Sequence, residues 1–186
     1  APGTRVLDVG CGDGALLDYL VHEKAVDGRG IELSSEGVNA SISQGLSVIQ
    51  GNAEIDLFDY PDGAFDYVVL SQTLQAMHEP KTILEQLLRI GRRAVVSLPN
   101  FAHWRLRWYL FVFGRMPVSA VLPDEWYETP NIHLCSIKDF VVLCRDLGIV
   151  IERSACLDER GERYRFGKSM RLANLLGEQA VFLLRR

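Results

Sequence analysis

One short segment constrains the fold of this chain more than any other, the sequence VLDVGCGDG at Val6 to Gly14. Its glycines, Gly10, Gly12 and Gly14, directly follow an apolar run and open a segment of helical period. Glycine suits such a turn because it accepts positive φ and leaves room for a ligand to approach the backbone. A glycine-rich turn between a strand and a helix is typical of nucleotide-binding α/β proteins. The segment therefore predicts an α/β fold with a ligand at this turn.

Short β-branched runs alternate with segments of helical period along most of the chain, which predicts strand–helix–strand units on a parallel sheet. We expect a doubly wound, mostly parallel sheet of seven strands. The expected strands are Arg5–Val9, Gly30–Leu33, Ser47–Gln50, Phe65–Leu70, Ala94–Leu98, Ile149–Ser154 and Ala180–Leu184. The expected helices are Gly14–Lys24, one that begins at Ser35, Lys81–Ile90 after Pro80, and Ile137–Leu147 between a Ser136 cap and Gly148.

The length of 186 residues suits a single domain, residues 1–186, because one hydrophobic core of this size can be buried without splitting. Two stretches break the alternation. The first, Phe101 to Cys135, is rich in tryptophan, tyrosine and proline, and the second, Asp158 to Met170, is dense in arginine and glutamate. We expect both to be insertions over a binding face. The chain begins almost at the first strand, so we expect any leading helix to be missing or very short.

Composition excludes several classes of function. The net charge of −4 argues against a nucleic-acid partner, which would require clustered cations. The four cysteines are scattered without a CxxC pair, so we expect reduced thiols. His103 and His133 have no second ligand at zinc spacing, which predicts no metal site. The sequence starts with no pattern typical of a signal peptide, so we expect the chain to be cytoplasmic. Its apolar run Trp104–Phe113 is short and contains arginines, so we expect no membrane partner.

The acidic residues around the glycine turn discriminate between ligands. Asp8 precedes the turn and Asp13 lies within it, so both would face the pyrophosphate of a bound NAD. Two like charges about 4–6 Å apart repel by roughly 3–4 kcal/mol at an effective dielectric constant near 20. The sulfonium and ammonium groups of S-adenosylmethionine reverse that sign. We therefore favour S-adenosylmethionine, or S-adenosylhomocysteine, and keep an NAD-dependent oxidoreductase as an alternative.

Two further positions fit an adenosyl ligand. Glu32 ends the second expected strand, where a carboxylate can accept both ribose hydroxyls. Asn52 follows the third, within GNA, where its side-chain oxygen can accept from the adenine amine and a backbone N–H can donate to the ring. The full set of candidate cofactor-binding residues is Asp8, Gly10, Cys11, Gly12, Gly14, Glu32, Leu33, Asn52, Ala53 and Ser71.

Over about the first hundred residues, the segments VLDVGCGDG, GIELS, QGNAE and FDYVVLSQTLQAMHEP resemble class I S-adenosylmethionine-dependent methyltransferases, most of which carry Asp where this chain has Asn52. A narrower resemblance, to the MetW methionine-biosynthesis family, covers nearly the whole chain. It is carried by the segments SQTLQAMHEP, SLPNFAHWRLRWYLFVFGRMPV and WYETPNIHLCSIKDF. The resemblance implies a Rossmann-like methyltransferase fold with an antiparallel last strand. It also implies association with homoserine O-acyltransferase, an early enzyme of methionine synthesis.

Two functional hypotheses follow. As a methyltransferase, the chain would hold an acceptor above Ser71 to Gln75, and catalysis would rest mostly on positioning. As a binding module, it would sense S-adenosylmethionine and modulate the acyltransferase through the insertion at Phe101 to Cys135. No catalytic residue is assigned, because His78 and Glu79 fit a helix entry better than an acid–base pair.

The aromatic residues of the first insertion have a spacing of their own. Trp104, Trp108 and Phe111 recur at intervals of four and three, which fits one side of a helix. We expect this stripe to pack onto the sheet, while Arg105 and Arg107 beside it leave room for a partner.

Overall fold

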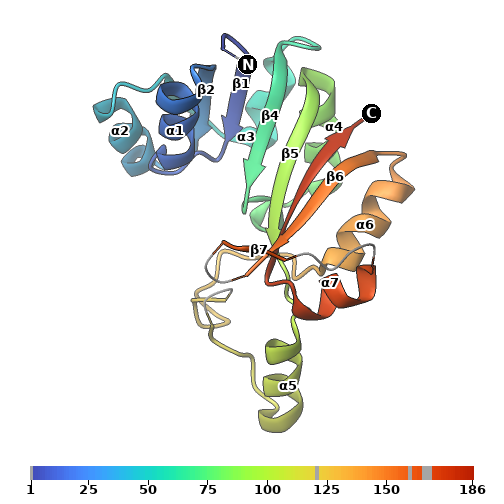
Figure 1. The fold of residues 1–186 in the computed structure, drawn as a ribbon. Helices are drawn as coiled ribbons and strands as arrows, with labels where there is room; N and C mark the ends of the chain where they lie inside the picture. Colours follow the sequence, from blue (N-terminus) through green and yellow to red (C-terminus); the bar gives the residue numbers. More distant parts are fainter. Residues whose placement is uncertain (1, 120–121, 159–160, 165–168) are drawn as a thin grey trace.

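The computed structural model describes residues 2–119, 122–158, 161–164 and 169–186, and its strands form one mixed sheet (Figure 1). The strand order is β3-β2-β1-β4-β5-β8-β6-β7. The strands are β1 (Arg5–Val9), β2 (Asp27–Glu32), β3 (Val48–Gln50), β4 (Phe65–Ser71), β5 (Gly91–Pro99), β6 (Val150–Leu157), β7 (Arg163–Tyr164) and β8 (Gln179–Arg185). The strands from β3 to β5 pair in parallel, whereas β8 is antiparallel to both β5 and β6.

The seven expected strands are all present, and the antiparallel last strand is confirmed. The sequence did not predict β7, a two-residue strand that pairs with the end of β6 inside the second expected insertion. Residues 159–160 and 165–168 of that insertion lie outside the described ranges.

The helices lie on both faces of the sheet, with α1 in front of it and α4 behind it in Figure 1. The α-helices are α1 (Ala15–Lys24), α2 (Ser35–Ser43), α3 (Ala53–Asp56), α4 (Pro80–Ile90), α5 (Trp104–Phe113), α6 (Ile137–Asp146) and α7 (Met170–Leu176). Two 3₁₀ turns, η1 (Leu57–Asp59) and η2 (Leu74–Ala76), flank β4. The predicted doubly wound arrangement is therefore confirmed, as are the Ser136 cap of α6 and the helix entry at Pro80.

The strand order reverses between β1 and β4, which is where ligands bind in open α/β sheets. The two strands run in register from Val6 beside Tyr67 to Val9 beside Leu70. Because both strands end together, the glycine turn after β1 lies next to the segment after β4.

The main core lies between the sheet and helices α4 and α6. On α4, Leu84 and Leu87 are fully buried, and on α6, Phe140 packs on Phe182 of β8 with ring centroids 4.6 Å apart. Full burial of one such side chain stabilises the fold by about 1.5–3 kcal/mol. This packing holds β4, β5 and β8 in the sheet.

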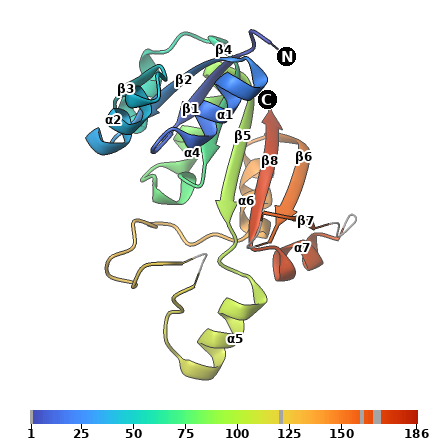
Figure 2. The same ribbon diagram turned by 60° about the vertical axis from the view of Figure 1, so that its left-hand side comes forward.

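The first insertion does not pack as the aromatic spacing predicted. Trp104, Trp108 and Phe111 are 45%, 62% and 83% exposed, and Leu106 is the buried residue of α5. Figures 1 and 2 show α5 projecting past the end of β5, away from the sheet. The expectation that the stripe packs onto the sheet is therefore wrong, because helical spacing marks a helix but not the neighbour it faces. No helix in the described ranges combines the length and apolarity needed to cross a bilayer.

Asn100, which follows β5, anchors the base of this insertion. Its side chain is completely buried and donates to the carbonyl oxygens of Asn174 at 2.9 Å and Gly177 at 2.7 Å. The side-chain oxygen of Asn100 accepts from the Ala102 N–H at 3.1 Å. The start of the insertion is thereby held to α7, and α5 follows only four residues after Asn100.

Candidate ligand site at the carboxyl edge of the sheet

The glycine turn has the conformation that its sequence predicts. Gly10, Gly12 and Gly14 have φ values of +69°, +56° and +84°. A side chain at Gly14 would meet Leu46 and Ser41 at 2.6 Å, whereas nothing lies within 4 Å of one placed at Gly12. Gly14 is therefore needed for packing, and Gly12 leaves an open side to the turn.

Helix α2 fixes the turn from the neighbouring βα unit. The Ser41 hydroxyl donates to the Gly12 carbonyl at 3.3 Å, and the Gln44 side chain donates to the Asp13 carbonyl at 2.9 Å. Gly37 permits this approach, because a side chain there would lie 2.7 Å from the Gly12 oxygen. Sequence reasoning missed these α2 residues, which lie more than 20 positions from the turn.

Glu32 lies at the end of β2, beside the glycine turn. Its Oε2 accepts from the Gly12 N–H at 2.9 Å, and its Oε1 accepts from both the N–H and the hydroxyl of Ser34 at 2.9 Å. A carboxylate offers about four acceptor positions. Three are filled by the protein, so one position on Oε2 is open for a ligand hydroxyl.

These hydrogen bonds set the charge of Glu32. Partial burial acts to raise its pKa, but donation from Ser34 and Gly12 outweighs burial and lowers the pKa below the usual 4.5. Hydrogen bonds to the charged form favour ionisation. Glu32 is therefore a fixed negative charge beside the turn near neutral pH.

Asp8 of β1 is a second acidic group, with a different environment. Its side chain is 1% exposed, and Oδ1 has no hydrogen-bond partner among the described residues. Burial first, and the Glu32 carboxylate second, raise the pKa of Asp8 from 3.8 to about 7. Asp13, by contrast, is exposed and accepts from the Ala15 N–H at the start of α1. A nearby cation would favour the charged form of Asp8.

Cys11 and Leu33, both at this edge, differ in exposure. Cys11 is buried in a small core cluster with Leu17 and Val48, and burial raises the pKa of its thiol to about 11. Leu33 follows Glu32 and is 66% exposed. Cys11 thus supports the turn from inside, whereas Leu33 offers an apolar surface to an aromatic ring.

Asn52 and Ala53 begin helix α3. The Asn52 side-chain oxygen accepts from the Glu54 N–H at 3.0 Å, which makes Asn52 the helix cap, and its own N–H donates to Asp56 at 2.7 Å. The oxygen predicted to accept from adenine therefore already accepts one hydrogen bond, and it keeps a second lone pair. Ala53 is the first residue of α3, so its N–H has no acceptor within the helix.

Ser71 ends β4 and is tied to β5. Its hydroxyl lies 3.0 Å from that of Ser97, and Gln72 beyond it has φ of +51°, rare for a residue with a side chain. Thr73 then packs on the glycine turn, because a Cβ on Gly10 would lie 3.0 Å from it. The segment after β4 is held against the turn.

The same segment contacts the first insertion. The carbonyl oxygen of Gln75 accepts from the N–H groups of Ile132 and His133, both at 2.9 Å. Gln75 therefore lies two residues from Thr73 on the turn and directly against the returning chain of the insertion. The segment from Thr73 to Gln75 therefore contacts both the glycine turn and the first insertion.

His78 pairs with a residue that sequence reasoning did not select. Its Nδ1 lies 2.9 Å from Oε2 of Glu54, and Oε1 of Glu54 accepts from the N–H groups of His78 and Glu79. Partial burial acts to raise the pKa of Glu54, but donation from His78 outweighs it and lowers the pKa. Glu54 therefore ties α3 to the start of α4.

The predicted residues gather at the carboxyl ends of adjacent strands. Those on the glycine turn come from β1, Glu32 and Leu33 from β2, Asn52 and Ala53 from β3, and Ser71 from β4. Within the described residues, no group of three or more histidine, cysteine or acidic side chains could hold a metal ion, and the four cysteines are free thiols.

The fold defined by this sheet and edge is that of class I S-adenosylmethionine-dependent methyltransferases. A methyltransferase from Archaeoglobus fulgidus has a TM-score of 0.67 at 15% identity and covers 99% of this chain and 86% of its own. One from Mesorhizobium loti has a TM-score of 0.68 at 14% identity, covering 100% and 92%. At such identities the likeness concerns the fold alone.

Sequence comparison is more specific. Residues 1–184 match the family described as "Methionine biosynthesis protein MetW", and the chain belongs to that family. It is 34% identical over 171 residues to the bifunctional methionine biosynthesis protein MetXA/MetW of Rhodopirellula baltica, covering 87% of this chain and 27% of that protein. It is 27% identical to norajmaline N-methyltransferase of Rauvolfia serpentina, over 74% of this chain and 49% of that protein. The chain thus spans half or less of the length of these relatives.

Proposed function

We propose that this chain binds S-adenosylmethionine or S-adenosylhomocysteine at the glycine turn and, in the cytoplasm, acts with homoserine O-acyltransferase in methionine synthesis. The observation that carries the proposal is the ionised Glu32, bonded to Gly12 on the open turn beside the unpartnered Asp8. Two acidic groups at such a turn complement a cationic adenosyl ligand and disfavour a pyrophosphate.

Each part of the ligand has a group to meet. The open position on Glu32 Oε2 accepts a ribose hydroxyl, and a second ribose hydroxyl requires Ser34 to release Oε1. Leu33 packs on the adenine ring, and the N–H of Ala53 donates to it, with Asn52 as second acceptor for the adenine amine. The methionine part lies along the glycine turn, where the negative charges of Glu32 and of ionised Asp8 attract its ammonium group.

The partnership rests on the relative from Rhodopirellula baltica, whose name places MetXA and MetW activities in one protein. A covalent fusion keeps two domains at equal amounts and at high effective concentration. We infer that this chain and its acyltransferase contact each other. The contact from Gly10 through Thr73 and Gln75 to the insertion gives the ligand a physical route to that partner.

Calorimetry with the purified chain tests the ligand. S-adenosylmethionine and S-adenosylhomocysteine should bind, whereas NAD should release no heat. A folded protein that binds NAD and neither adenosyl compound contradicts the proposal. The partnership is tested separately, by mixing the chain with homoserine O-acyltransferase with and without S-adenosylmethionine. Absence of a complex in both conditions contradicts the proposed partnership but not the proposed ligand.

Methyl transfer to a small acceptor is the second candidate. It is favoured by a hollow of about 340 Å³ beside the segment after β4. Apolar side chains such as Leu74 and Phe140 line it together with the polar Gln75, Lys81, His133 and Asp139. Several relatives are N-methyltransferases by name. Incubation with S-adenosylmethionine and a panel of amine, phenol and carboxylate acceptors tests it. Formation of S-adenosylhomocysteine above the acceptor-free rate supports turnover, and its absence across the panel counts against it.

A further inference from the structure

The most unusual surface of the molecule is the outer part of helix α5. Every residue from Arg107 to Gly114 is exposed, and the six from Trp108 to Phe113 are all aromatic or aliphatic. Single exposed apolar residues are ordinary, but a contiguous group marks an interaction surface. A helix that is apolar on all sides is normally buried. The described residues leave this one uncovered.

The exposed side chains form two ridges on different sides of the helix. Trp108 packs on Phe111 with ring centroids 6.0 Å apart, and Tyr109 packs on Phe113 at 4.7 Å. At about 100° per residue, the two pairs point roughly 150° apart around the helix axis. A flat surface would cover one ridge and leave the other in water. A groove covers both, as in recognition of a helix by a partner protein.

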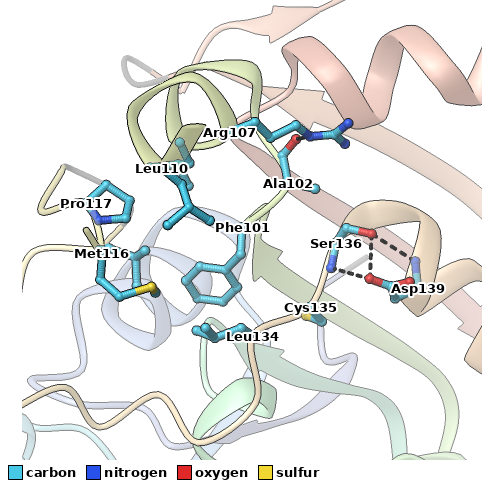
Figure 3. A pocket seen from close by; sticks show the side chains of 12 residues that line it. Phe101, Ala102, Arg107, Leu110, Met116, Pro117, Leu134, Cys135, Ser136 and Asp139 are labelled. Atoms are coloured by element: carbon cyan, nitrogen blue, oxygen red, sulfur yellow. Dashed lines mark hydrogen bonds between the residues drawn. The ribbon is translucent and has the colours of Figure 1, made fainter. Parts of the chain in front are cut away.

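The helix is also loosely supported from below. A cavity of about 290 Å³ lies between Leu110 on α5 and the returning chain at Leu134 and Cys135 (Figure 3). Leu106 of α5 also lines it. Phe101 points into this space from the base of the insertion (Figure 3). Protein interiors are close-packed, so a hollow of this size means that α5 does not pack tightly against the chain that faces it.

Charge adds a second constraint on the partner. From Phe101 to Pro123 the sequence contains three arginines, Arg105, Arg107 and Arg115, and no acidic residue. All three arginines are exposed, although Arg105 also lies 3.5 Å from the buried Glu178 carboxylate, so Arg107 and Arg115 contribute most of the basic surround. An apolar helix with a basic surround is complementary to an apolar groove with an acidic rim.

The same pattern argues against a lipid surface. A helix that lies on a membrane has one apolar and one strongly polar face. Arg105 and Arg107 of α5 lie two positions apart and so point about 160° apart around the axis, and Trp108 to Phe113 contains no charged residue, so α5 has no single polar face. A second copy of the chain is a competitor, because Asp124, Glu125 and Glu128 follow α5 and could meet its arginines.

We propose that α5 is the docking helix for the acyltransferase, inserting Trp108, Phe111, Tyr109 and Phe113 into an apolar groove whose rim is acidic. This inference rests on the partnership proposed above. It names the element that carries the binding free energy, since large aromatic side chains near the centre of an interface supply most of it. The arginines around α5 set the rate of association and its salt dependence.

Binding of the purified wild-type chain and of the double variant Trp108→Ala, Phe111→Ala to homoserine O-acyltransferase tests the proposal. The double variant should bind about 100-fold more weakly or not at all. The matched control is Tyr19→Ala, Phe58→Ala, which removes two exposed aromatic residues from other elements and should bind as wild type. Affinity for S-adenosylmethionine should be unchanged in both, which shows that the variants are folded.

Two results overturn the proposal, and two further measurements then identify another occupant of α5. If wild type and double variant bind the acyltransferase equally, α5 is not the docking helix and the partnership stands. If wild type does not bind the acyltransferase, the partnership fails as well. In that case, light scattering that detects a dimer lost in the double variant assigns α5 to a second copy, and sedimentation with phosphatidylglycerol vesicles lost in the double variant assigns it to lipid.

Discussion

The glycine turn and helix α5 both lie beyond the carboxyl ends of the strands, yet they are built in opposite ways. The turn is held by backbone and side-chain hydrogen bonds from Ile31, Glu32 and Ser41, and its three glycines fix its path. Helix α5 is joined to the rest at its base and exposes aromatic residues along its outer turns.

This difference indicates which kind of partner each region can bind. A preorganised turn needs little ordering to hold a small molecule, so most of the interaction free energy appears as affinity. An exposed apolar helix gains its free energy only when a large surface covers it. We therefore assign the turn to the adenosyl ligand and α5 to a protein, and the following variants test that division.

The largest expected effect is at Gly14. Gly14→Ala adds a side chain at positive φ, 2.6 Å from Leu46 and Ser41, which should lower the free energy of unfolding by about 2–5 kcal/mol. Gly63→Ala is the matched control, because Gly63 also has positive φ but has open space around it. It should lower the value by only about 1–2 kcal/mol. Urea unfolding measures both, and equal losses would show that the turn is not tightly packed.

The next effect concerns the ligand. Glu32→Gln removes a fixed negative charge and weakens the ribose contact, so affinity for S-adenosylmethionine should fall roughly 10- to 100-fold. Glu36→Gln, a nearby exposed position in the first turn of α2, should leave affinity unchanged. Calorimetry compares the two. Equal affinities for both variants would remove Glu32 from the site.

The third effect is a pH dependence centred on Asp8. Its raised pKa of about 7 means that the folded chain keeps a proton that the unfolded chain has lost above about pH 4. The free energy of unfolding should therefore fall as pH rises from about 4 to 7. A cationic ligand favours ionised Asp8, so affinity for S-adenosylmethionine should rise up to about tenfold between about pH 6 and pH 7.5.

The variant Asp8→Asn checks the assignment of this pH dependence. In this variant, the free energy of unfolding and the affinity for S-adenosylmethionine should both depend less on pH, while the ligand still binds. If the wild-type and variant profiles coincide, the titrating group is another residue and Asp8 does not meet the ligand.

The smallest effect is expected on α5. Phe111→Ser should change the free energy of unfolding by less than about 0.5 kcal/mol, because the side chain contacts little of the folded chain. Leu106→Ala, the buried position of the same helix, should lower it by about 2–5 kcal/mol. Thermal or urea unfolding distinguishes the two. A loss above 1 kcal/mol for Phe111→Ser would mean that α5 packs on its own chain.

Most of the fold could be predicted from local patterns in the sequence. The later part of β4, Val68 to Leu70, is a buried apolar run because helices cover both faces of a parallel sheet, and α4 is marked by Pro80 at its start. The conformation of the glycine turn also follows from composition, since alternate glycines are what alternating positive φ requires. The placement of Glu32 beside the turn follows from the parallel register of β1 and β2.

Features that depend on distant packing could not be predicted. Ser41 holds Gly12 across 29 positions, and Glu54 binds His78 across 24, so nothing in either local segment marks the contact. The stripe at Trp104, Trp108 and Phe111 predicted a helix correctly but not its exposure. Helical spacing is the same whether the apolar side meets a sheet of the same chain or a partner.

Hydrogen–deuterium exchange on the intact chain, with S-adenosylmethionine and separately with homoserine O-acyltransferase, tests most directly whether the glycine turn binds the adenosyl ligand and α5 binds a protein. S-adenosylmethionine should protect residues 10–14 and 30–34, and the acyltransferase should protect residues 104–113. Unchanged exchange at residues 10–14 under saturating S-adenosylmethionine would contradict binding at the glycine turn.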